Sequence, residues 1–177
     1  MTATALILEV PEAEPLVSRW RTLYDPSAVA AMPAHITLIF PFMLFEQIDR
    51  PVLDTLSAVF STTPRIDLQF SSTLRFPGVL WLAPDDPDPI VALVEALVSR
   101  FPERRPYGGA YGEIVPHLTI ADLHRDQAPE RTIDRIAREF HDEAATRLPV
   151  HAQVEAASLF RNEQGRWRAM RIFALRN

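Results

Sequence analysis

The same order of predicted secondary structure occurs twice along this chain, and that repeat restricts the fold more than any other feature of the sequence. After a first strand at 4–10, the order helix, strand, helix, strand, strand occurs in residues 12–83 and again in residues 89–175. A glycine precedes a tryptophan in the last strand pair of both units, as Gly78 with Trp81 and Gly165 with Trp167. An internal duplication of mixed strands and helices predicts an α+β fold built from two related lobes.

The individual elements follow from apolar periodicity and from turn residues. Apolar residues recur at a spacing of three and four in four expected helices, 12–24, 50–60, 89–101 and 130–147. Residues that favour strands gather in seven segments, 4–10, 34–40, 65–76, 79–83, 116–123, 150–160 and 166–175. Because nothing between the units has the composition of a linker, residues 1–177 are predicted to form one domain.

One strand in each unit carries the same short motif, His-x-Thr. His35 and Thr37 belong to the first unit, and His117 and Thr119 occupy the equivalent strand of the second. Alternate residues of a strand face the same way, so each histidine shares a face with its threonine while apolar neighbours face the core. If a pseudo-twofold axis relates the lobes, the two polar faces meet across a groove.

Two imidazoles and two hydroxyls on facing strands suit the cleavage of a phosphodiester. One group must take a proton from the attacking oxygen and another must protonate the departing oxygen, and two histidines can hold opposite protonation states near neutral pH. Threonine hydroxyls can bind the non-bridging phosphate oxygens. We therefore predict catalytic roles for His35 and His117 and phosphate binding by Thr37 and Thr119. The near-identical motifs leave open which histidine is the acid.

The histidines also have other interpretations. A single His-x-Thr occurs often by chance, but two copies in equivalent strands of a duplicated unit favour a function. His124, His141 and His151 lack the motif, and His141 and His151 are expected to be structural or surface residues. A metal hydrolase using His117, Asp122 and His124 is disfavoured, because position 117 faces away from positions 122 and 124 in a regular strand.

The chain lacks cysteine and lysine, so its 18 basic residues are all arginine. These absences exclude a disulfide framework, a thiol nucleophile, a thiolate zinc site, a Schiff base and a lysyl-adenylate. The net charge of −5 disfavours binding to long duplex nucleic acid, although a local site can still hold one phosphate or one RNA end. We expect no cofactor and no metal, because two-histidine chemistry requires neither.

No segment has the length and apolar content of a signal peptide or of a membrane span. The longest stretch of low charge, 28–45, is interrupted by Pro33 and Pro41 and contains His35. We therefore expect a cytoplasmic protein without a membrane partner, and we expect it to be a monomer.

The segments HITLIFPF and PHLTIA resemble the paired motifs of the two-histidine phosphoesterase superfamily, in particular its 2'-5' RNA ligase-like family. The resemblance extends over nearly the whole chain, including PYGGAYGEIVPHLTIA before the second motif and the closing strand with Trp167. It implies a bilobal fold of two antiparallel-rich sheets flanked by helices, with one motif from each lobe in a central cleft. It also implies metal-independent action on 2',3'-cyclic or 2'-5' phosphodiester bonds by His35 and His117, with Thr37 and Thr119 binding the phosphate.

One position departs from the pattern of this family. Members that ligate RNA commonly have an arginine three residues after the second threonine, where this chain has Asp122. A carboxylate in the groove would repel a substrate phosphate, so the departure favours a phosphodiesterase with a smaller substrate. Arg161 or Arg75 could compensate for the missing positive charge.

Further residues are candidates for substrate binding. Tyr107 and Tyr111 lie in the glycine-bearing loop before the second motif, where aromatic rings can stack on a nucleobase. Phe42 follows the first motif, and Arg161 ends a predicted strand. For each of them a role in packing, or a solvated position, is the alternative.

The leading hypothesis is a metal-independent cyclic phosphodiesterase or a related 2'-5' phosphoesterase, with a nucleotide or an RNA end as substrate. A non-catalytic module that binds RNA ends or nucleotides in the same groove is an alternative from another class. A 2'-5' RNA ligase that reverses cyclic phosphate cleavage is a further alternative.

Overall fold

The computed structural model describes residues 2–110, 112–124 and 130–177. Its helices and strands, in chain order, are β1 (Thr4–Glu9), η1 (Pro11–Ala13), α1 (Glu14–Tyr24), α2 (Pro26–Val29), β2 (His35–Ile39), η2 (Phe45–Gln47), α3 (Arg50–Thr62), β3 (Ile66–Phe76), β4 (Val79–Pro84), α4 (Asp88–Arg100), η3 (Pro106–Gly109), β5 (Leu118–Asp122), α5 (Glu130–Ala144), β6 (Val150–Val154), β7 (Ala156–Glu163) and β8 (Arg166–Ala174). The expected α+β class is confirmed.

The described strands form one curled antiparallel sheet in the order β6-β3-β4-β5-β2-β1-β7-β8. Its two halves meet between β2 and β5, where Ile36 lies opposite Leu118. We call this contact the β2–β5 joint. The two expected sheets are therefore the two halves of one sheet, four strands each, connected through a narrow contact between the motif strands.

The strand order is symmetric about the β2–β5 joint. Moving outward, β1 occupies the place in one half that β4 occupies in the other, and β7 corresponds in the same way to β3. Each half thus takes strands from both parts of the sequence. A repeat whose two units begin with β1 and with β4, one strand earlier than expected, would match this order. The boundaries 12–83 and 89–175 therefore remain a prediction.

Two local expectations need correction. The predicted strand at 150–160 is two strands, because β6 pairs with β3 while β7 pairs with β1 and β8. The positions that pack in the main core change from even numbers, as in Ala152, to odd numbers, as in Leu159, on either side of Glu155, where the chain crosses between the halves. The short helix α2 was not expected. Asp25 accepts a hydrogen bond from the Ser27 backbone N–H and caps it.

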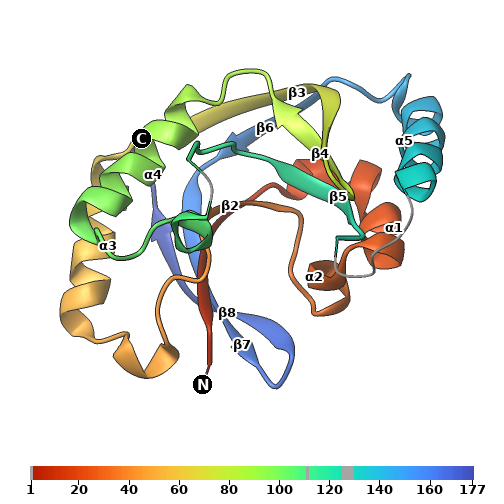
Figure 1. Cartoon of the computed structure of the whole chain (residues 1–177). Coiled ribbons are helices and arrows are strands. Elements are labelled where there is room, and N and C mark those ends of the chain that lie inside the picture. The colour runs from red at the N-terminus through yellow and green to blue at the C-terminus, as the bar shows by residue number, and fades with distance from the viewer. Residues whose placement is uncertain (1, 111, 125–129) are drawn as a thin grey trace.

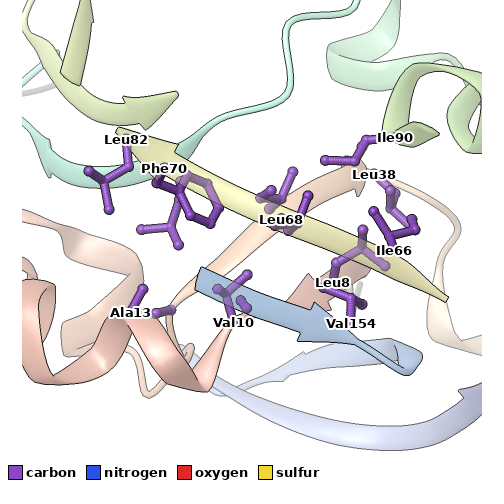
Figure 2. Close-up of a cluster of buried hydrophobic side chains, with 14 of the residues drawn as sticks. Leu8, Val10, Ala13, Leu38, Ile66, Leu68, Phe70, Leu82, Ile90 and Val154 are labelled. Carbon is purple, nitrogen blue, oxygen red and sulfur yellow. The ribbon is translucent and has the colours of Figure 1, made fainter. Parts of the chain in front are cut away.

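One large apolar core supports both halves of the sheet. Figure 2 shows Leu8 of β1 and Leu38 of β2 in the same cluster as Phe70 of β3. In Figure 1, α3 and α4 lie together at the left of the view and α1 and α5 lie at the right, and all four helices contribute residues to this core. Trp20 of α1 packs edge to face on Phe140 of α5 with ring centroids 5.8 Å apart. The core therefore packs against the apolar face of the motif strands, opposite their histidines and threonines.

None of the helices in the described part of the chain is both long and apolar enough to cross a membrane.

Candidate active site

The register at the β2–β5 joint brings the two motifs side by side. Ile36 and Leu118 lie opposite each other and are fully buried in the core. In an antiparallel pair, this register places His35 across from Thr119 and places Thr37 across from His117. Because residues on either side of a paired position point to the other face, all four motif side chains share one face of the sheet, which we call the polar face.

Both histidine rings are held by the same hydrogen bond to the backbone. Nδ1 of His35 is 2.7 Å from the carbonyl oxygen of Pro33, and Nδ1 of His117 is 2.7 Å from that of Val115. A carbonyl oxygen only accepts, so each Nδ1 carries a hydrogen and donates it. In the neutral ring this assigns the lone pair to Nε2, which is then the nitrogen that can exchange a proton.

The two threonines of the motif are half-buried beside the histidines. Thr37 lies opposite Ile7 of β1, and Thr119 lies opposite Trp81 of β4. Each hydroxyl is therefore on the polar face, next to the histidine of the other motif. A phosphate bound between the two imidazoles would lie within the same quartet of side chains.

Aromatic rings surround His117. Phe76 and Trp81 meet its imidazole edge to face at centroid distances of 5.3 and 5.7 Å, and they stack on each other at 4.9 Å. The ring of Tyr107 lies nearly parallel to the imidazole at 6.4 Å. The sequence analysis predicted Tyr107 here but did not identify Phe76, whose signal was only its place before the Pro77-Gly78 turn.

The surroundings of His35 are different. Ile7, Ala5, Met32 and Phe160 form a small apolar cluster on this side of the sheet. Phe40 and Trp167 pack on the cluster and meet each other edge to face at 5.7 Å. Trp167 therefore lies on the His35 side as Trp81 lies on the His117 side.

Burial lowers the pKa of both histidines, and a neighbouring positive charge lowers it further at His35, whereas the charge beside His117 acts in the raising direction. For His35, burial and then the positive charge of Arg21 lower the pKa to about 4, against the raising effects of the Pro33 carbonyl and Asp25. For His117, burial lowers the pKa, while the Val115 carbonyl and the Asp122 carboxylate act in the raising direction. Near neutral pH both rings of the free protein therefore favour the neutral form.

A bulge in β5 places Asp122 on the polar face. Thr119 pairs with Trp81 and Ala121 pairs with Leu80, so Ile120 is one extra residue on this strand. The extra residue returns Asp122, opposite Val79, to the same face as Thr119. The carboxylate that replaces the family arginine is thus close enough to influence His117.

Two of the predicted substrate-binding residues lie elsewhere. Phe42 is 1% exposed and packs edge to face on Phe101 in the main core, so it cannot touch a substrate. Arg161 follows Phe160, which belongs to the small apolar cluster, so strand alternation directs the arginine to the opposite face. There its guanidinium lies over the Phe45 ring.

Neither proposed compensating arginine is available on the polar face. Arg161 forms an ion pair with Glu163. Arg75 lies opposite the buried Leu80 and forms an ion pair with Asp134 of α5. The remaining candidate, Tyr111, lies outside the described residues.

The other histidines do not join the site. His124 is exposed, and so are His141 and His151, for which a structural or surface role was expected. Among the described residues, no three histidine, aspartate or glutamate side chains form a group suited to a metal ion. The bulge places Asp122 on the face of His117, where a regular strand would direct it away, but His117, Asp122 and His124 still do not form such a group.

Sequence reasoning missed a buried ion pair beside the first motif. Arg21 of α1 is 2% exposed and its Nη2 lies 3.0 Å from Asp25, which is 4% exposed. A signal was present, because Arg21 follows Val17 by four residues and therefore shares the apolar stripe of its helix.

Comparison with known proteins agrees with this architecture. The structure is similar to E. coli LigT complexed with NADP+, at 18% identity and a TM-score of 0.60, over 99% of this chain and 98% of that one. It is also similar to TT0787 of Thermus thermophilus, at 16% identity and a TM-score of 0.59, over 99% and 98% of the two chains. Usb1 of Kluyveromyces marxianus is 12% identical, with a TM-score of 0.52 over 97% of each chain.

A search of curated protein sequences finds no match. The model of the 2'-5' RNA ligase superfamily matches residues 9–166, which include both motifs and all strands from β2 to β7. This chain belongs to the 2'-5' RNA ligase superfamily.

Proposed function

We propose that this protein is a metal-independent phosphoesterase that cleaves 2',3'-cyclic or 2'-5' phosphodiester bonds of nucleotides or RNA ends. The observation that carries the proposal is the register of the β2–β5 joint, with Ile36 opposite Leu118. That register sets two imidazoles and two hydroxyls on one face, and the matched Nδ1 hydrogen bonds leave both Nε2 atoms for proton transfer. General acid-base catalysis of this kind contributes about 10²–10⁴-fold for each group.

For a 2',3'-cyclic phosphate the reaction needs one proton removed and one supplied. One histidine takes a proton from water as the water oxygen forms a bond to phosphorus. The other histidine gives its proton to the departing ribose oxygen as the bond from phosphorus to that oxygen breaks. The product is a phosphomonoester, and proton exchange with solvent restores both rings. Thr37 and Thr119 donate hydrogen bonds to the non-bridging oxygens throughout.

Nucleotide binding is supported from two directions. LigT, which has the same fold, was crystallised with NADP+, with 3'-AMP and with ATP. In this chain, Tyr107 is 37% exposed and lies parallel to the His117 ring, so it offers an aromatic face beside the acid-base pair. Stacking of a base on such a ring contributes about 1–3 kcal/mol.

Asp122 favours hydrolysis of a small substrate over the joining of RNA ends. Its carboxylate on the polar face adds negative charge where a longer strand would bring further phosphates. Neither Arg75 nor Arg161 compensates for this charge, since both form ion pairs elsewhere.

The test is a turnover assay in EDTA with nucleoside 2',3'-cyclic phosphates and 2'-5' dinucleotides. We expect cleavage by the wild type and loss of at least about 10²-fold in His35→Ala and in His117→Ala. His141→Ala, an exposed histidine away from the joint, is the matched control and should retain full activity. Activity that survives both motif substitutions, or that appears only when a metal is added, would contradict the proposal. Binding of a cyclic phosphate without turnover would favour the non-catalytic module.

A further inference from the structure

Arg21 and Asp25 are the charged side chains that are fully buried in the described part of the chain. Removing an ion from water costs several kcal/mol, so a buried guanidinium persists only where its hydrogen bonds are satisfied. Arg21 meets this condition: Nε donates to Asp25 at 3.1 Å, and Nη2 donates to Ser27 Oγ at 3.2 Å and to the Met32 carbonyl at 3.2 Å. Nη1 also lies 3.8 Å from Glu14.

This network reaches the three residues that precede His35. The Met32 carbonyl accepts from Arg21, and the Ala34 N–H donates to Glu14 Oε1 at 2.6 Å. Between them, the Pro33 carbonyl accepts from His35 Nδ1. The backbone group that orients the imidazole is therefore clamped on both sides, by Arg21 itself and by its partner Glu14.

The charged and titratable groups that face His35 come from three elements. Arg21 and Asp25 belong to α1 and its C-terminal cap, and the charge of Arg21 has the larger influence. Glu9 lies opposite His35 on β1, where its carboxylate accepts a hydrogen bond from Ser158. His117 lies across the β2–β5 joint and also disfavours a proton on His35.

We propose that Arg21 is a positioning residue that dedicates His35 to the role of general base, by clamping the Met32–Ala34 segment and by placing a fixed positive charge beside the imidazole. This inference rests on the proposed function and assigns the two histidines different roles within it. His117 is then the general acid, with the Asp122 carboxylate favouring its proton.

The assignment solves a problem that two adjacent histidines create. An empty site that held two protons would have no base, and burial together with the charge of Arg21 prevents this at His35. When the anionic phosphate enters between the rings, its charge raises the pKa of both imidazoles. His35 then gains basicity only when a substrate is bound, and His117 holds its proton more firmly.

The test is an NMR titration of the His35 imidazole in Arg21→Met, compared with the wild type. Losing the neighbouring positive charge should raise the pKa of His35 by about one pH unit or more. Arg19→Met, on the same helix but with a side chain that is 73% exposed, is the matched control and should leave the titration unchanged. The low-pH limb of kcat/KM for a cyclic phosphate should move by the same amount in Arg21→Met and not in Arg19→Met.

Arg21→Met leaves Asp25 buried without its partner, so the variant could fail to fold. Arg21→Gln/Asp25→Asn keeps hydrogen-bonding groups at both positions without charge, and the cap oxygen for Ser27 is retained. Because Arg21 outweighs Asp25 at His35, the pKa should still rise, by less than in the single variant. An unchanged His35 titration in the folded variant overturns the inference.

The NMR readout separates this inference from the proposed function. If His35 titrates as expected but no phosphodiester is cleaved by any form, the proposed function fails while the effect of Arg21 on His35 stands. If the wild type is active and the low-pH limb does not move in the folded Arg21 variant, the assignment of His35 as base fails alone.

Discussion

The two motif strands share the His-x-Thr motif and the same Nδ1 hydrogen bond, yet their surroundings differ. His35 lies beside a buried guanidinium and a small apolar cluster, whereas His117 lies among aromatic rings and near the Asp122 carboxylate. Positive charge opposes protonation of the first imidazole, and negative charge favours protonation of the second. A duplicated motif can therefore supply an acid and a base without any change in the motif itself.

The largest expected effect tests whether the two histidines have different roles. Each histidine is removed in turn, and the residual rate is followed as a function of pH. Both His35→Ala and His117→Ala should lose about 10²–10⁴-fold in kcat/KM. The residual rate of His35→Ala should no longer fall at low pH, and that of His117→Ala should no longer fall at high pH. Stopped assays from acidic to mildly alkaline pH measure both limbs. If the two variants lose the same limb, or lose the limbs in reverse, the assigned roles are wrong.

The same comparison predicts an acidic optimum for the wild type. The limbs of kcat/KM follow the free protein, so the low-pH limb should lie near pH 4 and the high-pH limb below pH 6.5. The limbs of kcat should lie at higher pH, because a bound phosphate raises both pKa values.

An intermediate effect concerns stability in acid. The pKa of His35 is about 4 in the fold and near 6.5 in the unfolded chain, so the unfolded chain binds the extra proton between these values. The free energy of unfolding should therefore fall as pH drops from 6.5 towards 4, with about 2 kcal/mol from His35. Urea unfolding at about pH 7.5 and at about pH 4.5 measures this change in the free energy of unfolding, because the two values span most of the pH range.

His35→Gln removes this contribution and should lose less stability between the two pH values than the wild type does. The exposed His141→Gln is the control and should behave as the wild type. Equal losses in all three proteins would mean that His35 is not held neutral by its surroundings.

The smallest effect comes from Asp122. Asp122→Asn removes the charge that favours a proton on His117, so the high-pH limb should move down by about half a pH unit, or about threefold in rate on that limb. Asp54→Asn, an exposed carboxylate on α3 that pairs with Arg50, should leave the profile unchanged. If the high-pH limb stays in place in Asp122→Asn, the charge difference between the two motif strands arises only at His35.

The motif strands were predictable because their signals are local. A histidine and a threonine two residues apart in an apolar strand predict a polar face, and the burial of Ile36 and Leu118 agrees with that pattern. What the sequence did not predict was that these two strands are direct neighbours. Pairing between strands so distant in sequence depends on the packing of the whole sheet, and no local pattern specifies it.

The positions of Phe42, Arg161 and Arg21 were not specified by the sequence, for the same reason. Phe42 follows the motif closely, but the chain turns into the core there, and an apolar ring is compatible with either place. Strand alternation gives the direction of Arg161 only once the face of Phe160 is known, and contacts with Phe45 and Glu163 hold the arginine on the other face. The burial of Arg21 did have a local signal, its place on the apolar stripe of α1, but arginine is rarely fully buried and the stripe alone does not identify its partner Asp25.

The β2–β5 joint also determines how this protein can lose its function. Each half of the sheet owns a single histidine and a single threonine of the quartet, so neither half holds a working proton-transfer pair. If a nick, a truncation or partial unfolding separates the two halves of the sheet, neither half is expected to retain partial activity. Under the proposed mechanism, catalytic competence is thus an all-or-none property of the intact sheet.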